Sequence, residues 1–133
     1  MEEYLHQDLT SKIIGAFYKV YNTLGYGFLE KVYESALKIE IEKLGLHVER
    51  QMPINVLYDN FIVGEYYSDL LVENKVIVEL KACEQLALEH EFQLINYLKA
   101  TTIEIGLLFN FGKKPEVRRK IFTNDQKKMR KSV

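Results

Sequence analysis

The chain has 133 residues, of which 47% are hydrophobic and 28% charged, and its net charge is −1. This length suits one compact domain with a real core and excludes two large domains. The single cysteine, Cys83, excludes an internal disulfide, and no apolar run reaches the roughly 18 residues that span a bilayer. The opening MEEYLHQDLT is acidic and polar, where a secretory signal is basic and then apolar. We therefore expect a soluble cytoplasmic protein with no membrane partner.

The charge is distributed unevenly along the chain. Residues 1–112 hold 9 basic and 17 acidic residues, a net charge of −8, whereas residues 113–133 hold 9 basic and 2 acidic residues, a net charge of +7. A basic segment of this kind can contact phosphates, or it can be a solvated terminus. We expect one domain over residues 1–122 and a basic C-terminal tail over residues 123–133.

The first two predicted elements are amphipathic helices. Apolar residues recur at spacings of three and four from about residue 6 to residue 24, and again from about residue 29 to residue 44. A glycine follows each segment, Gly25 and Gly45, and glycine is a typical helix stop. The tripeptide at residues 25–27 then predicts a tight connection between the two helices.

The pattern next changes to that of strands. Residues 47–58, 61–72 and 75–82 are predicted strands joined as a meander, with a turn signal at residues 59–60. Helical spacing returns over residues 86–99, an apolar strand follows at residues 103–111, and residues 117–122 fit a weak strand or a helix. The continuous apolar run at residues 76–78 is typical of a strand covered on both faces. We therefore expect an α/β fold of order α-α-β-β-β-α-β, with a mixed sheet of about four strands flanked by helices.

Three charged residues interrupt these apolar strands. Glu79 and Lys81 are two residues apart, so they point to the same face of their strand. Asp69 lies on the preceding strand. A three-residue turn at residues 73–75 would pair it with Glu79 on that face, whereas a two-residue turn would place it opposite residue 78 or 80. The sequence alone leaves this register open.

If Asp69 and Glu79 meet, their repulsion has to be offset. Two like charges about 4 Å apart repel by roughly 4 kcal/mol at an effective dielectric constant near 20, a large fraction of a domain's stability. Either one carboxylate holds a proton or a cation lies between them, and carboxylate oxygens are ligands that Mg²⁺ and Mn²⁺ prefer. A solvated face with a cross-strand ion pair is the competing interpretation. The surrounding runs look buried, however, and buried charges need partners or ions.

The same residues resemble a known family. Asp69 followed by Glu79-Leu80-Lys81 resembles the core motif of the PD-(D/E)XK nuclease superfamily, with Ser68 where proline often stands. The segment GFLEKVY, residues 27–33, resembles the GxxExxY signature of a small family within that superfamily, through Gly27, Glu30 and Tyr33. The resemblance extends from about residue 7 to residue 122. It implies a restriction-endonuclease-like three-layer fold.

The resemblance also implies an activity and a site. The activity is metal-dependent hydrolysis of phosphodiester bonds in nucleic acid, with DNA expected rather than RNA. The metal would be Mg²⁺ or Mn²⁺, held by Asp69, Glu79 and the backbone carbonyl of Leu80, with Glu30 contributing directly or through water. Lys81 would position the nucleophile, so the implied catalytic residues are Lys81, Glu30, Asp69 and Glu79.

Two residues of the third predicted helix complete the implied site. Gln93 and Tyr97 resemble a QxxxY motif found in nuclease domains of recombination helicase-nucleases, and residues four apart share a helix face. Gln93 would hold a metal-bound water or a substrate phosphate, and Tyr97 would contact a phosphate or simply pack. For Tyr97, Tyr33 and the other tyrosines, a core or rim position is the more common role.

Two other functions remain open. One is a nucleic-acid-binding or protein-binding adaptor that keeps the motif without cleaving anything, and the other is a structural protein with a buried salt-bridge cluster. Because the chain is acidic before its tail and has no separate recognition module, substrate binding would depend on the tail or on a partner, as a homodimer or with a partner protein. Retention of all five polar residues favours the enzyme, because a degenerate site would be expected to lose some: Glu30, Asp69, Glu79, Lys81 and Gln93.

Overall fold

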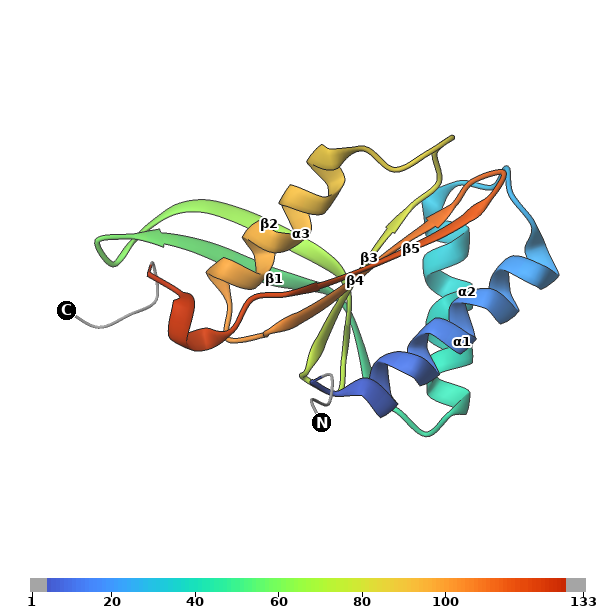
Figure 1. The fold of residues 1–133 in the computed structure, drawn as a ribbon, viewed down its shortest axis with the longest axis horizontal. Helices are drawn as coiled ribbons and strands as arrows, with labels where there is room; N and C mark the ends of the chain where they lie inside the picture. Colours follow the sequence, from blue (N-terminus) through green and yellow to red (C-terminus); the bar gives the residue numbers. More distant parts are fainter. Residues whose placement is uncertain (1–4, 129–133) are drawn as a thin grey trace.

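The computed structural model describes residues 5–128, which form helices on both faces of a five-stranded sheet (Figure 1). The elements are α1 (Gln7–Leu24), α2 (Glu30–Lys43), β1 (Val48–Tyr58), β2 (Phe61–Val72), β3 (Val76–Lys81), α3 (Leu88–Ala100), β4 (Ile105–Phe111), β5 (Pro115–Ile121) and the short 3-10 helix η1 (Asn124–Gln126). In this part of the chain no helix is long and apolar enough to cross a membrane.

The sheet has the strand order β1-β2-β3-β4-β5. β3 and β4 are parallel and are connected through α3, whereas the other neighbouring strands are antiparallel. The predicted α/β class and order of elements are therefore confirmed. The expectation of about four strands was too low, because residues 115–121 form the edge strand β5. Three consecutive basic residues at positions 118–120 hide the alternation that would have identified this strand.

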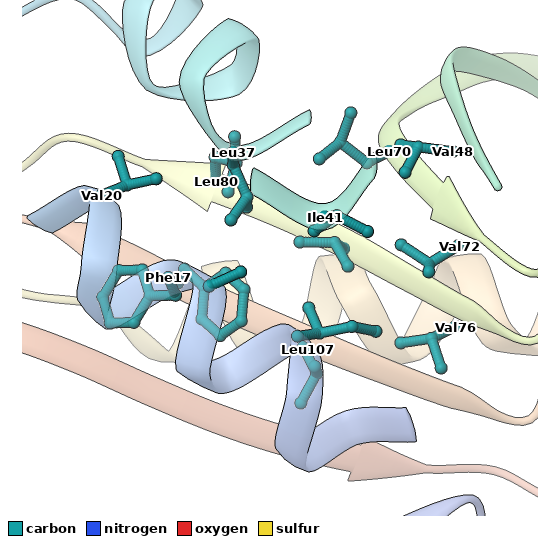
Figure 2. Close-up of a cluster of buried hydrophobic side chains, with 14 of the residues drawn as sticks. Phe17, Val20, Leu37, Ile41, Val48, Leu70, Val72, Val76, Leu80 and Leu107 are labelled. Atoms are coloured by element: carbon teal, nitrogen blue, oxygen red, sulfur yellow. The ribbon is translucent and has the colours of Figure 1, made fainter. Parts of the chain in front are cut away.

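Two hydrophobic clusters cover the two faces of the central strands. In the larger one, α1 and α2 pack on the sheet (Figure 2). The ring of Phe17 stacks on that of Phe109, with centroids 4.4 Å apart. The second cluster lies under α3. Val76 and Val78 belong to the first cluster and Ile77 to the second, so β3 is covered on both sides, as its apolar run predicts.

The turn between β2 and β3 sets the register of the charged residues. It has three residues, and the first two, Glu73 and Asn74, adopt left-handed backbone conformations with φ of 53° and 56°. The strands pair Val72 with Val76 and continue regularly to residues 70 and 78. One further step places residue 69 opposite residue 79. The three-residue alternative is therefore the correct one.

The β1–β2 hairpin changes faces along its length. Val48 packs in the cluster under α1 and α2, whereas Ile54 packs under α3, although residues an even number apart share a face in a regular strand. The change occurs at Gln51, which has a left-handed φ of 52°. Gln51 lies between two paired positions whose partners flank Asp69 on β2. Beyond this point the hairpin extends away from α1 and α2 and lies beside α3 (Figure 1).

The expected tail at residues 123–133 lies partly outside the described residues. Its first part contains η1 and then Lys127, whose side chain is buried. The Lys127 Nζ donates hydrogen bonds to the carbonyl oxygens of Thr101 and Ile103, at 2.8 and 2.7 Å. The beginning of this basic segment is therefore packed on the loop that follows α3.

Candidate active site

Asp69 and Glu79 meet between β2 and β3. The backbone N–H of Asp69 donates to Glu79 Oε2, and the N–H of Leu80 donates to Asp69 Oδ2, both at 2.8 Å. These two bonds take the place of the regular β2–β3 ladder, which ends at residues 70 and 78. Among residues 5–128, the other oxygen of each carboxylate accepts no hydrogen bond. We call Asp69 and Glu79 the acid pair.

Burial and mutual repulsion disfavour the charged form of the acid pair. Glu79 is only 5% exposed, and burial raises its pKa to about 8, with a further contribution from the charge of Asp69. The pKa of Asp69 is also raised, chiefly by burial. Neither residue forms a salt bridge within the described part of the chain. At neutral pH the pair therefore retains a proton in the absence of a bound cation.

Lys81 lies at the end of β3, two residues beyond Glu79, and is half-buried. Its positive charge lowers the pKa of both acids, although burial outweighs this effect. Within residues 5–128 it forms no salt bridge with either acid, so its ammonium group lies near the pair without neutralising it directly.

A buried amide holds the loop that follows Lys81. Asn110 Nδ2 donates to the Cys83 carbonyl at 2.9 Å and to Glu116 Oε1 at 2.8 Å, and its Oδ1 accepts from the Cys83 N–H at 3.0 Å. Glu116 Oε1 also accepts from the Leu86 N–H at 3.0 Å. Side chains of β4 and β5 thus fix the connection between Lys81 and α3. Sequence reasoning missed Asn110, and the available signal was one amide in an otherwise apolar buried strand.

Gly112 packs against the same loop, and a substitution at Gly112 can test how closely the loop is packed. A Cβ at this position would lie 2.2 Å from the Cys83 carbonyl oxygen, so Gly112→Ala should displace the loop and lower the free energy of unfolding by roughly 1–3 kcal/mol. A Cβ added at Gly15 in α1 would meet no atom within 4 Å, so Gly15→Ala should instead stabilise the protein by about 0.5–1 kcal/mol. Urea unfolding measures both, and effects of the same sign would contradict this description.

The tyrosine of the GxxExxY segment has a structural role. The Tyr33 hydroxyl donates to the Gly25 carbonyl at 2.7 Å and accepts from the Phe28 N–H at 3.2 Å. Its buried ring stacks on Phe111, with centroids 4.1 Å apart. Gly27 has φ of 111°, a conformation suited to glycine. Two of the three signature positions therefore shape the α1–α2 connection.

Glu30, the third signature position, is the first residue of α2 and is exposed. Its charge contributes to raising the pKa of Asp69 and Glu79, so it lies within electrostatic range of both. In the described part of the chain, no three His, Cys, Asp or Glu side chains are grouped closely enough to hold a metal ion. The structure thus brings Asp69 and Glu79 together. Glu30, the third predicted acidic ligand, lies near them but is not grouped closely enough with them to complete a metal site.

Sequence reasoning missed an ion pair near Asp69 between the buried Glu34 and the exposed Arg50. Glu34 Oε2 accepts from Arg50 Nη2 at 2.7 Å and Nε at 2.8 Å, and Glu34 Oε1 accepts from Gln51 Nε2 at 3.0 Å. The charge of Glu34 contributes to the raised pKa of Asp69. Its position four residues after Glu30, on the same helix face, was the only sequence signal. These bonds fix β1 at the point where the hairpin changes faces.

Gln93 and Tyr97, the two predicted site residues of α3, lie on the same side of the sheet as the acid pair. Tyr97 is buried, and its pKa is raised to about 12 by burial and by the charges of Glu79 and Asp69. Gln93 is half-buried one turn earlier. Both line a groove of about 410 Å³ between α3 and the hairpin, together with Val56, Tyr66, Glu89, Phe92 and Asn96. We call this the α3 groove.

Comparison with known proteins identifies the family. A family model of the PD-(D/E)XK nuclease superfamily matches residues 7–120, from the start of α1 to the last residue but one of β5. No match was found among curated proteins or among solved structures. The three helices and the mixed five-stranded sheet of the described residues are consistent with a restriction-endonuclease-like fold. The chain therefore belongs to the PD-(D/E)XK nuclease superfamily.

Proposed function

We propose that this protein is a metal-dependent nuclease that hydrolyses phosphodiester bonds, with DNA as its expected substrate. The observation that carries the proposal is the acid pair. Its two carboxylates are brought together by backbone hydrogen bonds, their pKa values are raised, and no side-chain cation among the described residues neutralises them. Such a pair is costly in a purely structural role, whereas a bound cation would offset its repulsion.

The donor set fits a hard divalent cation. Within the described part of the chain, each carboxylate has one oxygen without a hydrogen bond, and Mg²⁺ is commonly held by one or two carboxylates while keeping several waters. The Leu80 N–H points toward Asp69, and the C=O of a strand residue points to the same side as its N–H, so the Leu80 carbonyl is a suitable third donor. Asp69, Glu79 and Leu80 would hold Mg²⁺ or Mn²⁺, with Glu30 acting through water. When bound, the ion lowers the pKa of water and stabilises negative charge on phosphate oxygens.

The remaining site residues act on the substrate directly. Lys81 would hold the attacking water and stabilise charge that develops on the phosphate. Like an ordinary tyrosine, Tyr97 keeps its hydroxyl proton at neutral pH, and burial and the nearby carboxylates raise its pKa further, to about 12. It would therefore donate a hydrogen bond to a phosphate oxygen without adding a negative charge. Gln93, on the same helix face, would orient the phosphate or its water through its amide.

Thermal unfolding with and without Mg²⁺ tests this proposal. At a hundred times its dissociation constant, the ion should add about 2.7 kcal/mol to the free energy of unfolding, which raises the melting temperature by roughly 10 °C. The variant Asp69→Asn keeps the shape of the side chain and should lose this shift. Asp59→Asn removes an exposed carboxylate from the β1–β2 turn and should retain it.

Cleavage assays then separate the nuclease from the adaptor. Labelled single-stranded DNA, duplex DNA and RNA are incubated with the protein and Mg²⁺, with Asp69→Asn as the inactive control. Metal-dependent cleavage lost in the variant supports the proposal. Metal-dependent stabilisation without cleavage of any substrate would favour the adaptor, and a melting temperature indifferent to the ion would contradict a preformed metal site.

A further inference from the structure

The α3 groove has the size and position of a ligand site. Its volume of about 410 Å³ lies within the range of about 300–1,000 Å³ that is usual for small-molecule sites. One wall comes from α3 and the other from the outer half of the β1–β2 hairpin, residues 52–67. The nuclease chemistry proposed above uses only Gln93 and Tyr97 of its lining, so most of the groove has no assigned role.

Two aromatic rings line the groove while remaining accessible. Tyr66 of β2 is 48% exposed and Phe92 of α3 is 58% exposed. The Tyr66 ring also contacts the ring of the buried Tyr97, with centroids 5.8 Å apart. Accessible rings on both walls offer π-faces to a flat ligand, which is how proteins bind unpaired nucleobases.

The polar lining suits an uncharged ligand that carries both donors and acceptors. Gln93 and Asn96 each supply an amide with a carbonyl acceptor and an NH₂ donor, and the edge of a nucleobase carries the same mixture of groups. Among residues 5–128, no Lys or Arg lines the groove, and Glu89 is the one charged residue in its lining. Glu89 would repel a phosphate held beside it, whereas it would not repel a neutral base.

Tyr97, which lines the groove, lies near the acid pair. Tyr97 belongs to the same hydrophobic cluster as Leu71 and Ile77, which lie two residues from Asp69 and Glu79 on their strands. The charges of both acids also act on the Tyr97 hydroxyl. A nucleotide with its base in the groove would therefore hold its backbone beside the acid pair.

We propose that the α3 groove binds one unpaired nucleobase of the substrate, stacked on Tyr66 and Phe92 with its edge on Gln93 and Asn96, and that the substrate is single-stranded nucleic acid. This inference rests on the proposed nuclease function, because the groove is assigned to the strand that would be cleaved. A base within a duplex is already paired and stacked, so it cannot enter the groove without being unpaired.

Binding of short labelled oligonucleotides in EDTA, measured by fluorescence anisotropy, tests the groove separately from cleavage. Phe92→Ala should weaken binding of single-stranded DNA by about tenfold, since one base–aromatic stack is worth roughly 1–3 kcal/mol. Tyr67→Ala is the matched control, because Tyr67 is also exposed and adjoins Tyr66 on β2 but does not line the groove. It should change binding by less than about twofold. Wild-type protein should bind the single strand at least about tenfold more tightly than a duplex of the same length.

A strand with abasic sites distinguishes base stacking from phosphate contact. It keeps every phosphate but loses both stacking contacts and the contacts to the base edge, so it should bind wild-type protein at least as weakly as intact DNA binds Phe92→Ala, and Phe92→Ala should weaken its binding no further. Equal binding of the intact strand by wild type and Phe92→Ala, or of intact and abasic strands by wild type, would overturn the proposal. If Mg²⁺-dependent cleavage persists in that case, only the groove assignment fails. Binding that depends on the groove, without cleavage of any substrate, would support base binding and contradict the proposed nuclease activity.

Discussion

Lys81→Ala is expected to slow phosphodiester cleavage by about 10²–10⁴-fold while leaving the stabilisation by Mg²⁺ intact. The side chain lies beside the acid pair, but it forms no salt bridge with either carboxylate among the described residues. In the proposed site, its removal would therefore take a positive charge away from the phosphate and its attacking water while leaving the carboxylate oxygens in place. The effect should appear in the rate of cleavage at saturating substrate.

Single-turnover cleavage and thermal unfolding in Mg²⁺ check this prediction together. Lys75→Ala is a matched control, because Lys75 is exposed in the turn before β3 and should change neither measurement. If Lys81→Ala also abolished the Mg²⁺-dependent melting shift, the lysine would be needed to build the cation site rather than to act on the substrate. Cleavage at the wild-type rate would place the reaction elsewhere on the protein.

Glu79→Gln is expected to stabilise the metal-free protein in alkaline solution and to abolish its response to Mg²⁺. The folded protein raises the pKa of Glu79 from 4.5 to about 8, so the folded state binds the proton more tightly than the unfolded state does. This contribution to the free energy of unfolding is fully present below about pH 4.5 and is lost as the pH rises through about 8, at a cost of up to roughly 5 kcal/mol. Glutamine carries no charge and can still accept the hydrogen bond from the Asp69 N–H.

Urea unfolding in EDTA at pH 5, 7 and 9 measures this difference. The free energy of unfolding of wild type should fall relative to that of Glu79→Gln across this range. Glu65→Gln, which alters an exposed carboxylate of β2, should follow the wild-type curve. Parallel curves for wild type and Glu79→Gln would show that Glu79 is not titrating in this range. In Mg²⁺ the order should reverse, because only wild type can gain stability from the ion.

Much of the fold follows from local patterns in the sequence. Helix periodicity and the glycine stops predict α1 and α2 to within a residue or two, and the turn signal at residues 59–60 predicts where β1 ends and β2 begins. The meeting of Asp69 and Glu79 could be stated only as an alternative, since it depends on two residues without a glycine's freedom adopting left-handed conformations, Glu73 and Asn74. That choice is made by the packing of the flanking strands.

The supporting residues of the site could not be predicted in the same way. Glu34 reaches Arg50 across two elements, and Asn110 holds a loop that precedes it by 27 residues. Each interaction depends on how helices and strands are placed relative to one another, whereas sequence patterns describe one element at a time. The α3 groove has the same origin, because its walls are contributed by segments that are adjacent only in the folded chain.

The change of faces at Gln51 also bears on cooperativity. Because one hairpin contributes Val48 to the first hydrophobic cluster and Ile54 to the second, disrupting either cluster detaches a strand that the other one needs. The two halves of the core are thereby coupled, and the domain should lose both in a single two-state transition. Asp69 of the acid pair lies opposite Gln51, where the hairpin changes faces. The binding free energy of a ligand at the acid pair should therefore add in full to the free energy of unfolding of the whole domain.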